Sequence, residues 1–252
     1  MHCRNEAMHS TSHGICRICA GHYAGQYGVE LWVNMQQPIA YDSCKRPLYL
    51  QPHHLQVAHC DPQRLIARCH MEVFSVWIFV AHAPHSGHPG HVRSAWWTRT
   101  QELIDQFGEG APWIWLIDAN AAPGDADQCT VFRDMPTSRS TELFRQCLAA
   151  NELCLPATMD CHLGTNTTWT SLDGTSEHCI DHVAVPRQWR AYCTYSSVLD
   201  TLDLGNLHDD HRAVALQISW QSYAPAQPTR KNSQKVDWNS PAVRQNLRSE
   251  EH

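Results

Sequence analysis

The sequence lacks three features that would place it in other classes of protein. No apolar run approaches the ~20 residues that a transmembrane helix needs, so we expect no membrane partner. The first residues, Met1 to Glu6, lack the apolar stretch of a secretion signal, which favours an intracellular location. Basic residues are also scarce, because 19 Lys and Arg face 25 Asp and Glu and give a net charge of −6. This balance counts against a generally basic surface for nucleic acid.

Cysteine is abundant but has no regular spacing. The chain holds 12 cysteines in 252 residues and is too long for a disulfide-stapled scaffold, so we expect reduced and mostly buried thiols. His13, Cys16, Cys19 and His22 could be drawn as a zinc site. Structural zinc sites usually place a longer loop between their ligand pairs, which argues against zinc here.

The composition favours one sizeable domain, since 42% of the residues are hydrophobic and 17% are charged. Single α/β or β-sandwich domains do reach roughly 200–250 residues. After Trp220 the chain turns polar and holds Pro225 and Pro228. We therefore expect a domain over 1–220 and a polar linker or disordered tail over 221–252.

Hydrophobic periodicity predicts strands along the whole domain, with helices after some of them. Strands are predicted at 28–34, 54–59, 65–70, 73–82, 113–117, 167–170, 178–185, 193–198 and 213–220, with a short candidate at 48–51. Helices are predicted at 92–107 and 141–151, and Trp96 and Trp97 fit core and surface positions of the first. The two classes do not alternate regularly, so a layered α/β sandwich is favoured over a doubly wound sheet.

The strand at 113–117 is followed by two polar residues, Asp118 and Asn120, where the strand becomes a loop. A carboxylate and an amide in this position can orient a phosphate and the water that attacks it. The same pair can also form an Asx-turn that simply caps the strand. Both interpretations are open at this point.

Three further strand ends carry polar side chains. They are His82 in Ala-His-Ala-Pro, Asp181 in Ile-Asp-His-Val, and the pair Asp210-His211. Each has a structural alternative, since His82 could be a turn residue before proline and the two aspartates could simply end strands. Arg212 follows His211 directly and is expected to be solvated on the opposite face.

These motifs resemble those of the endonuclease/exonuclease/phosphatase superfamily. The family's Gly-Asp-Phe-Asn motif is similar to Ile117-Asp118-Ala119-Asn120, its Asp-Tyr motif to Asp181-His182, and its Ser-Asp-His motif to Asp209-Asp210-His211. The aromatic strand at Thr168-Trp169 also fits, and the motifs occur in the family's order over 113–220. The resemblance implies a four-layer α/β sandwich, in which two packed, mostly antiparallel β-sheets are flanked by helices.

The resemblance covers the N-terminus less well. The family's metal-binding glutamate follows a strand in a Gln-Glu pair, to which Asn5-Glu6 is similar, so Glu6 becomes the candidate ligand and Glu30 an ordinary strand residue. The family's first strand, which ends in an asparagine, has no counterpart. The expectation is therefore an N-terminally truncated copy of the domain.

The chemistry that the family implies is hydrolysis of a phosphodiester by in-line attack of water. His211 would be the general base or would bind the phosphoryl oxygen, and Asp181 would fix its tautomer. Asp118 would orient or deprotonate the water, and Asn120 would donate to a phosphate oxygen. His82 stands where the family often has Tyr or His near the scissile phosphate.

Metal and substrate contacts follow from the same resemblance. Glu6 and Asp210 offer hard oxygen ligands suited to Mg²⁺ (or Mn²⁺), and Asp209, which replaces the family's serine, adds a further carboxylate. His85 and Trp169 are candidate substrate-binding residues.

The segment 28–34 and the stretch 118–125 resemble the endonuclease domains of non-LTR retrotransposons. Such a domain nicks DNA, would place the protein in the nucleus, and would have a reverse transcriptase as a partner domain beyond the tail. Two alternatives stay open: a phosphatase acting on a small or lipid phosphoester, and a catalytically inactive fragment or interaction module of the same fold.

Overall fold

The computed structural model describes residues 8–21, 28–42, 44–108, 111–123, 138–200 and 210–219. Glu6, Asp209 and the tail from residue 221 lie outside these ranges, so what was predicted for them stays a prediction. None of the helices within the ranges is both long and apolar enough to cross a membrane.

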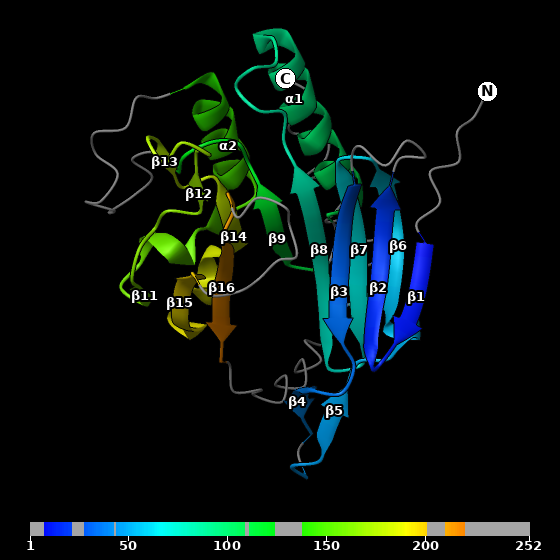
Figure 1. The fold of residues 1–252 in the computed structure, drawn as a ribbon. Helices are drawn as coiled ribbons and strands as arrows, with labels where there is room; N and C mark the ends of the chain where they lie inside the picture. The colour runs from blue at the N-terminus through cyan, green and yellow to red at the C-terminus, as the bar shows by residue number, and fades with distance from the viewer. Residues whose placement is uncertain are drawn as a thin grey trace, which may run out of the picture. The chain divides into compact units, whose positions relative to one another are not determined.

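The largest sheet has six strands in the order β10-β14-β9-β8-β7-β6 (Figure 1). Its strands are β6 (Leu55–Asp61), β7 (Arg64–Met71), β8 (Phe74–His82), β9 (Trp113–Asp118), β10 (Leu153–Cys154) and β14 (Asp181–Pro186). The first three form an antiparallel meander, as the pattern around Asp61-Pro62 predicts. Strand β9 then runs parallel to β8 after a helical crossover, and β14 runs antiparallel to β9.

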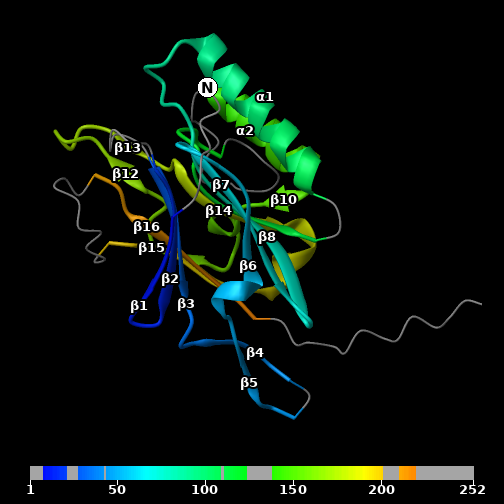
Figure 2. The same cartoon turned by 90° about the vertical axis from the view of Figure 1, so that its right-hand side faces the viewer.

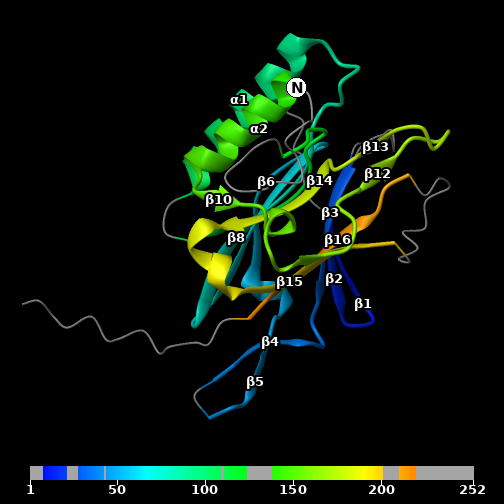
Figure 3. The same cartoon turned by 90° about the vertical axis from the view of Figure 1, so that its left-hand side faces the viewer.

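Two helices, α1 (Gly90–Phe107) and α2 (Arg139–Ala150), cover one face of this sheet (Figure 3). Helix α2 begins at Ser138, whose hydroxyl accepts the Thr141 N–H at 3.1 Å. Both Trp96 and Trp97 of α1 are buried, so the prediction that one of them lies at the surface is wrong.

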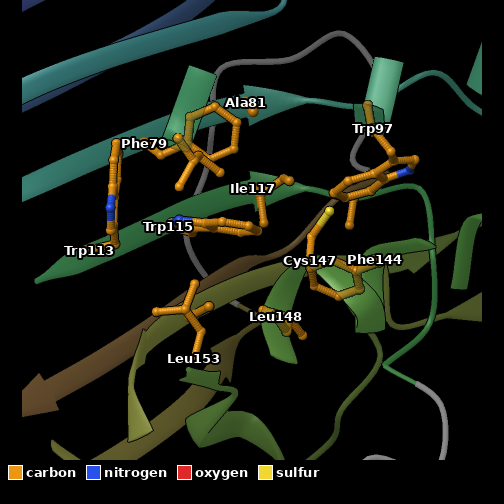
Figure 4. Packing of buried hydrophobic residues seen from close by; sticks show 14 of the residues in the cluster. Phe79, Ala81, Trp97, Trp113, Trp115, Ile117, Phe144, Cys147, Leu148 and Leu153 are labelled. Atoms are coloured by element: carbon orange, nitrogen blue, oxygen red, sulfur yellow. The ribbon is translucent and has the colours of Figure 1, made fainter. Parts of the chain in front are cut away.

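The core beneath the helices is rich in aromatic residues (Figure 4). Trp115 of β9 packs edge-on against Phe79 of β8, with ring centroids 5.2 Å apart. On the helix side, Trp97 meets Phe144 of α2 at 5.5 Å. Each fully buried aromatic side chain contributes roughly 2–3 kcal/mol of hydrophobic stabilisation. This packing therefore fixes the helices against β8 and β9, the strands that carry His82 and Asp118.

The opposite face is covered by a three-stranded sheet (Figure 2). Its strands are β1 (Met8–Ser12), β2 (Ile15–Gly21) and β3 (Gly28–Asn34). The first two are joined by His13 and Gly14, whose φ values of 51° and 76° form a two-residue hairpin turn. Sequence patterns missed this hairpin because His-Gly is not one of the usual turn pairs. Among the described residues, neither Cys16 nor Cys19 belongs to a group that could hold a metal.

The remaining strands complete the second layer and the loops. They are β4 (Pro38–Tyr41), β5 (Pro47–Tyr49), β11 (His162–Leu163), β12 (Trp169–Thr170), β13 (Glu177–His178), β15 (Cys193–Leu199) and β16 (Ala213–Ile218). Strand β16 packs against β14, while β3 packs against β7 and β8. The predicted layered α/β sandwich is therefore confirmed, and both α-helices of the described ranges lie over the six-stranded sheet.

Arg64 ties this sheet to α1 through a buried network. Its guanidinium donates to Asp61 Oδ2 at 2.8 Å, to Thr100 Oγ1 at 2.9 Å and to the Trp96 carbonyl at 3.0 Å. The same group lies 4.4 Å from the centroid of the Trp96 ring, where a cation–π contact adds to the attraction. The pKa of Asp61 falls to about 2 because His59, Arg64 and the Gln63 N–H outweigh the opposing effect of burial.

Arg64→Met should therefore lower the free energy of unfolding by about 3 kcal/mol, because it removes the buried cation that pairs with Asp61 and donates to the Trp96 carbonyl. Equilibrium urea unfolding would measure the loss. Arg99→Met is the matched control, since Arg99 is exposed on α1 and pairs with an equally exposed Glu102. The control should lose less than about 0.5 kcal/mol. Equal losses in the two variants would contradict the role of the buried network.

Candidate active site

Three strands bring polar side chains to one edge of the six-stranded sheet. Strand β8 is parallel to β9, so its last residue, His82, lies in register with Asp118. Strand β14 is antiparallel to β9, so its first residue, Asp181, also lies in register with Asp118. Neighbouring strands are about 4.8 Å apart, so the three side chains form a short row. Asp181 therefore begins its strand rather than ending it, but it reaches the predicted edge.

His211 joins this row from a segment far away in the sequence. It forms an isolated antiparallel bridge with Trp169, and the Thr170 N–H donates to the Asp210 carbonyl at 2.8 Å. The Nδ1 atom of His211 lies 3.0 Å from Asp181 Oδ2. Asp118, Asp181 and His211 each place one ligand atom within 4.8 Å of the others. The predicted centre of the site is thus assembled from three separate parts of the chain.

Asp118 and Asn120 form the Asx-turn that was one of the two interpretations of this stretch. The Asn120 N–H donates to Asp118 Oδ1 at 2.9 Å, and Asn120 has a φ of 45°, in the left-handed region. The Asn120 amide nitrogen also donates to the Ala83 carbonyl at 2.8 Å. The turn and the functional interpretation are compatible, because the turn is what holds both side chains at the mouth of the site.

The electrostatics of the cluster depend on two neighbouring carboxylates. Burial and the charge of Asp181 raise the pKa of Asp118 to about 7. The hydrogen bond that His211 Nδ1–H donates to Asp181 raises the pKa of His211, which favours its imidazolium form. Burial and the nearby His211 lower the pKa of His82, whose Nε2 lies 3.4 Å from Asp118 Oδ2. The site therefore pairs a carboxyl that titrates near neutrality with a histidine biased toward positive charge.

Other predicted site residues lie around this centre or elsewhere. Trp169 stacks on His178 with ring centroids 5.6 Å apart, next to His211. His85 is exposed, and its ring lies 4.5 Å from that of His88. Asp210 is half-buried beside His211 and lies outside the group formed by Asp118, Asp181 and His211, so its role as a metal ligand stays a prediction.

Arg212 was predicted to be solvated on the opposite face. It makes an ion pair with Asp200 at 3.3 Å and keeps 30% of its side chain exposed. The cavity of about 460 Å³ lined by Arg145, Arg187 and Arg190 is separate from the grouped ligands, and it contains none of the cluster residues.

Sequence reasoning missed two supporting residues. Thr168 is buried, and its Oγ1 accepts the N–H groups of Ile180 at 2.9 Å and Asp181 at 3.0 Å. His182 is also buried, and burial lowers the pKa of its imidazole. A threonine before an aromatic residue and a histidine inside an apolar strand carry no local signal for these roles. Both depend on contacts across the fold.

The donor set suits a divalent cation. Two carboxylates, Asp118 and Asp181, face one another with a histidine nitrogen beside them. Hard oxygen donors are what Mg²⁺ and Mn²⁺ bind in proteins. The like charge that raises the pKa of Asp118 is the condition that a bound cation would relieve.

Comparisons with solved structures show which fold the chain has. No protein-family model matches the sequence, and no curated protein matches it either. Among solved structures, the chain is similar to the 3′-5′ exonuclease NExo from Neisseria meningitidis, with a TM-score of 0.57, 17% identity, and coverage of 82% of this chain and 80% of that chain. The chain has the endonuclease/exonuclease/phosphatase fold. The resemblance seen in its motifs is thereby confirmed at the level of the fold.

Two further structures share this fold. One is a Neisseria NExo described as a 3′ phosphatase bound to product DNA hairpin, with a TM-score of 0.55, 17% identity, and coverage of 82% of this chain and 80% of that one. The other is a mannosyl-6-phosphatase from Bacteroides thetaiotaomicron, with a TM-score of 0.50, 18% identity, and coverage of 82% and 78%. The structures that share this fold are thus described as an exonuclease in one case and as phosphatases in the other two.

Asp118→Asn should stabilise the fold by an amount that depends on pH. The folded carboxyl keeps its proton until about pH 7, whereas the unfolded one ionises near its ordinary value of 3.8. As the pH rises from 4 to 7, ionisation of Asp118 in the unfolded state lowers the free energy of unfolding of the wild type. Above pH 7 this loss is constant. Asparagine has no such penalty, so the gain should grow across this window to about 2–4 kcal/mol.

Urea unfolding at several pH values in EDTA measures this gain. Asp105→Asn, at an exposed carboxylate on α1, is the control and should show no such trend. A gain for Asp118→Asn that did not change between pH 4 and 7 would contradict the raised pKa.

Proposed function

We propose that the chain is a metal-dependent phosphodiester hydrolase, and that it acts as a DNA endonuclease that nicks one strand. The observation that carries the proposal is the cluster of Asp118, Asp181 and His211, whose ligand atoms lie within 4.8 Å of one another at the sheet edge. Perturbed titratable groups gathered at one site favour catalysis over a purely structural role.

Each residue of the cluster has a role that its geometry supports. Asp181 holds Nδ1 of His211, so Nε2 is the nitrogen left for the substrate. Because the pKa of His211 is raised, it suits a charged donor that binds a phosphoryl oxygen. Asp118 lies in the same cluster and suits the group that orients the attacking water or takes its proton. Asn120 keeps a second amide hydrogen that can donate to a phosphate oxygen as negative charge develops there.

A divalent cation, Mg²⁺ or Mn²⁺, completes this proposal. Asp118 and Asp181 are the described carboxylates that would hold it, with Asp210 nearby and Glu6 as the further ligand proposed from the sequence. When bound, the metal supplies neutralisation of the phosphate charge and of the leaving oxygen. His82, His85 and Trp169 remain the proposed contacts to the substrate on either side of the cluster.

DNA is the proposed substrate because two motif regions, 28–34 and 118–125, resemble endonuclease domains of non-LTR retrotransposons. On the same ground we infer that a reverse transcriptase domain is the natural partner and that the protein works in the nucleus. The domain boundary at residue 220 belongs to this proposal, with 221–252 as the linker. It is supported by a compact unit that ends at Ser219.

A phosphatase is the second candidate. Two of the three structures described above are named as phosphatases, one acting on a sugar phosphate and one described with a DNA product. The cluster would serve a phosphomonoester by the same chemistry, since water attacks phosphorus in both reactions. A 3′-phosphorylated oligonucleotide and an inositol phosphate are the substrates that separate this candidate from a nuclease.

An inactive module of the same fold is the third candidate, and one structural observation favours it. In the second layer, β3 lies over β7 and β8 and β16 lies over β14, with β9 between them. Ile114 and Leu116 of β9 face that layer and stay partly exposed, although β9 is a central strand. Within the described residues, the second sheet therefore leaves part of β9 uncovered.

The purified chain should convert supercoiled plasmid to the nicked form in Mg²⁺, and EDTA should abolish the reaction. Asp118→Ala and His211→Ala should each lower the rate at least about 100-fold, because they remove the base and the phosphoryl donor. Gel densitometry over time measures the rate.

Asp105→Ala and His53→Ala replace exposed residues of the same types and are the matched controls, expected to keep the wild-type rate. Equal nicking by wild type and by the two site variants would reveal a contaminating nuclease. Absence of Mg²⁺-dependent nicking would overturn the endonuclease proposal. Phosphate release from either phosphomonoester would then favour the phosphatase, and its absence would favour the inactive module.

A further inference from the structure

His182 lies one residue beyond Asp181, so its side chain points to the opposite face of β14. It is only 2% exposed, and its ring stacks on that of Phe144 in α2, with centroids 5.0 Å apart and an angle of 28° between the planes. Its Nε2 atom lies 2.9 Å from the Ala121 carbonyl oxygen. Because a carbonyl can only accept, the proton is on Nε2 and the ring is the Nε2–H tautomer.

The other ring nitrogen has no hydrogen-bond partner within the described part of the chain. His182 Nδ1 is buried and unpartnered, an arrangement that costs about 1–3 kcal/mol. A phenylalanine would fill the same space and stack on Phe144 without that cost. The one contact that requires a histidine here is the hydrogen bond to Ala121, so this contact is the place to look for its role.

Ala121 belongs to the short loop that carries Asn120. The N-terminal side of this loop is fixed by the Ala119 N–H, which donates to the Ile180 carbonyl at 2.8 Å. The Asn120 N–H is fixed by Asp118 at 2.9 Å. On the C-terminal side, the contact that the described residues provide to the Ala121 carbonyl is His182. Asn120 itself has a left-handed backbone, with a φ of 45°, which needs support from both sides.

We propose that His182 is a positioning residue, whose hydrogen bond to the Ala121 carbonyl holds Asn120 in the orientation that contacts the substrate phosphate. The proposal rests on the hydrolase function argued above, although its structural part can be tested without any activity. His182 does not reach the reacting atoms, and it acts through the loop backbone. It also couples the site to α2, because the same ring packs on Phe144.

The catalytic test uses His182→Phe and His182→Gln in the full chain. The phenylalanine keeps the stacking and loses the donor, so we expect kcat for plasmid nicking to fall roughly 10- to 100-fold while KM stays within about threefold. The glutamine places an amide N–H near the position of Nε2 and should recover part of the loss. A fall in kcat that glutamine does not relieve would contradict the role of the donor.

A double-mutant cycle separates positioning from general loss of structure. If His182 acts through Asn120, His182→Phe should have little further effect in an Asn120→Ala background. If the role of His182 is purely structural, His182→Phe should lower kcat by the same factor in both backgrounds. That result would overturn the proposal.

Hydrogen exchange followed by mass spectrometry tests the structural part independently of catalysis. The amides of residues 119–122 should exchange at least about tenfold faster in His182→Phe than in wild type, because opening of the loop becomes easier. His182→Gln should be intermediate, and peptides from β7 should be unchanged. If the chain has no hydrolase activity, a change in exchange confined to this loop still supports the contact. Unchanged exchange in this loop overturns the proposal whatever the activity.

Discussion

The position of β9 between a parallel and an antiparallel neighbour is the constraint on which the site depends. Parallel pairing with β8 places the carboxyl ends of two strands together, and antiparallel pairing with β14 adds the amino end of a third. His82, Asp118 and Asp181 meet because of these two registers. A shift of either register by one residue would turn a site side chain to the other face of the sheet. The buried aromatic residues of β8, β9 and the two helices keep the registers fixed.

That arrangement places two carboxylates side by side, which is electrostatically unfavourable. The pKa of Asp118 is raised because burial and the charge of Asp181 act in the same direction. Asp181 meanwhile gains a favourable partner in His211. Asp118 keeps the Asn120 N–H and His82 as local contacts, but these do not offset burial and the charge of Asp181, so its pKa stays raised. Strain of this kind is common at functional sites, where a ligand or a cation relieves it.

The supporting contacts extend well beyond the cluster. Thr168 orients Asp181 through two backbone N–H groups, and His182 holds the loop after β9. Both residues are buried and act on the site through backbone hydrogen bonds, and His182 also contacts Phe144 of α2. The helices thus do more than cover the sheet, because α2 packs directly on the residue that holds the Asn120 loop.

Much of the fold follows from local patterns. The run from Trp113 to Ile117 is apolar and β-branched, so it predicts a buried strand, and the helical period after Val92 predicts α1. The hairpin at His13-Gly14 was missed because its turn residues are unusual. Order along the chain also predicted one site for Asp118, Asp181 and His211, and the structure places their ligand atoms within 4.8 Å of one another.

The sequence by itself determined most of the longer strands, both described helices and the polar residues near their ends, because periodicity and turn chemistry act between near neighbours. Only the tertiary structure decided which of these residues meet, since His82 and Asp118 are joined by strand pairing across a helical crossover. It also decided their charge. A pKa near 7 for Asp118 arises from burial and from the proximity of Asp181, and neither can be read from the residues beside it in the chain.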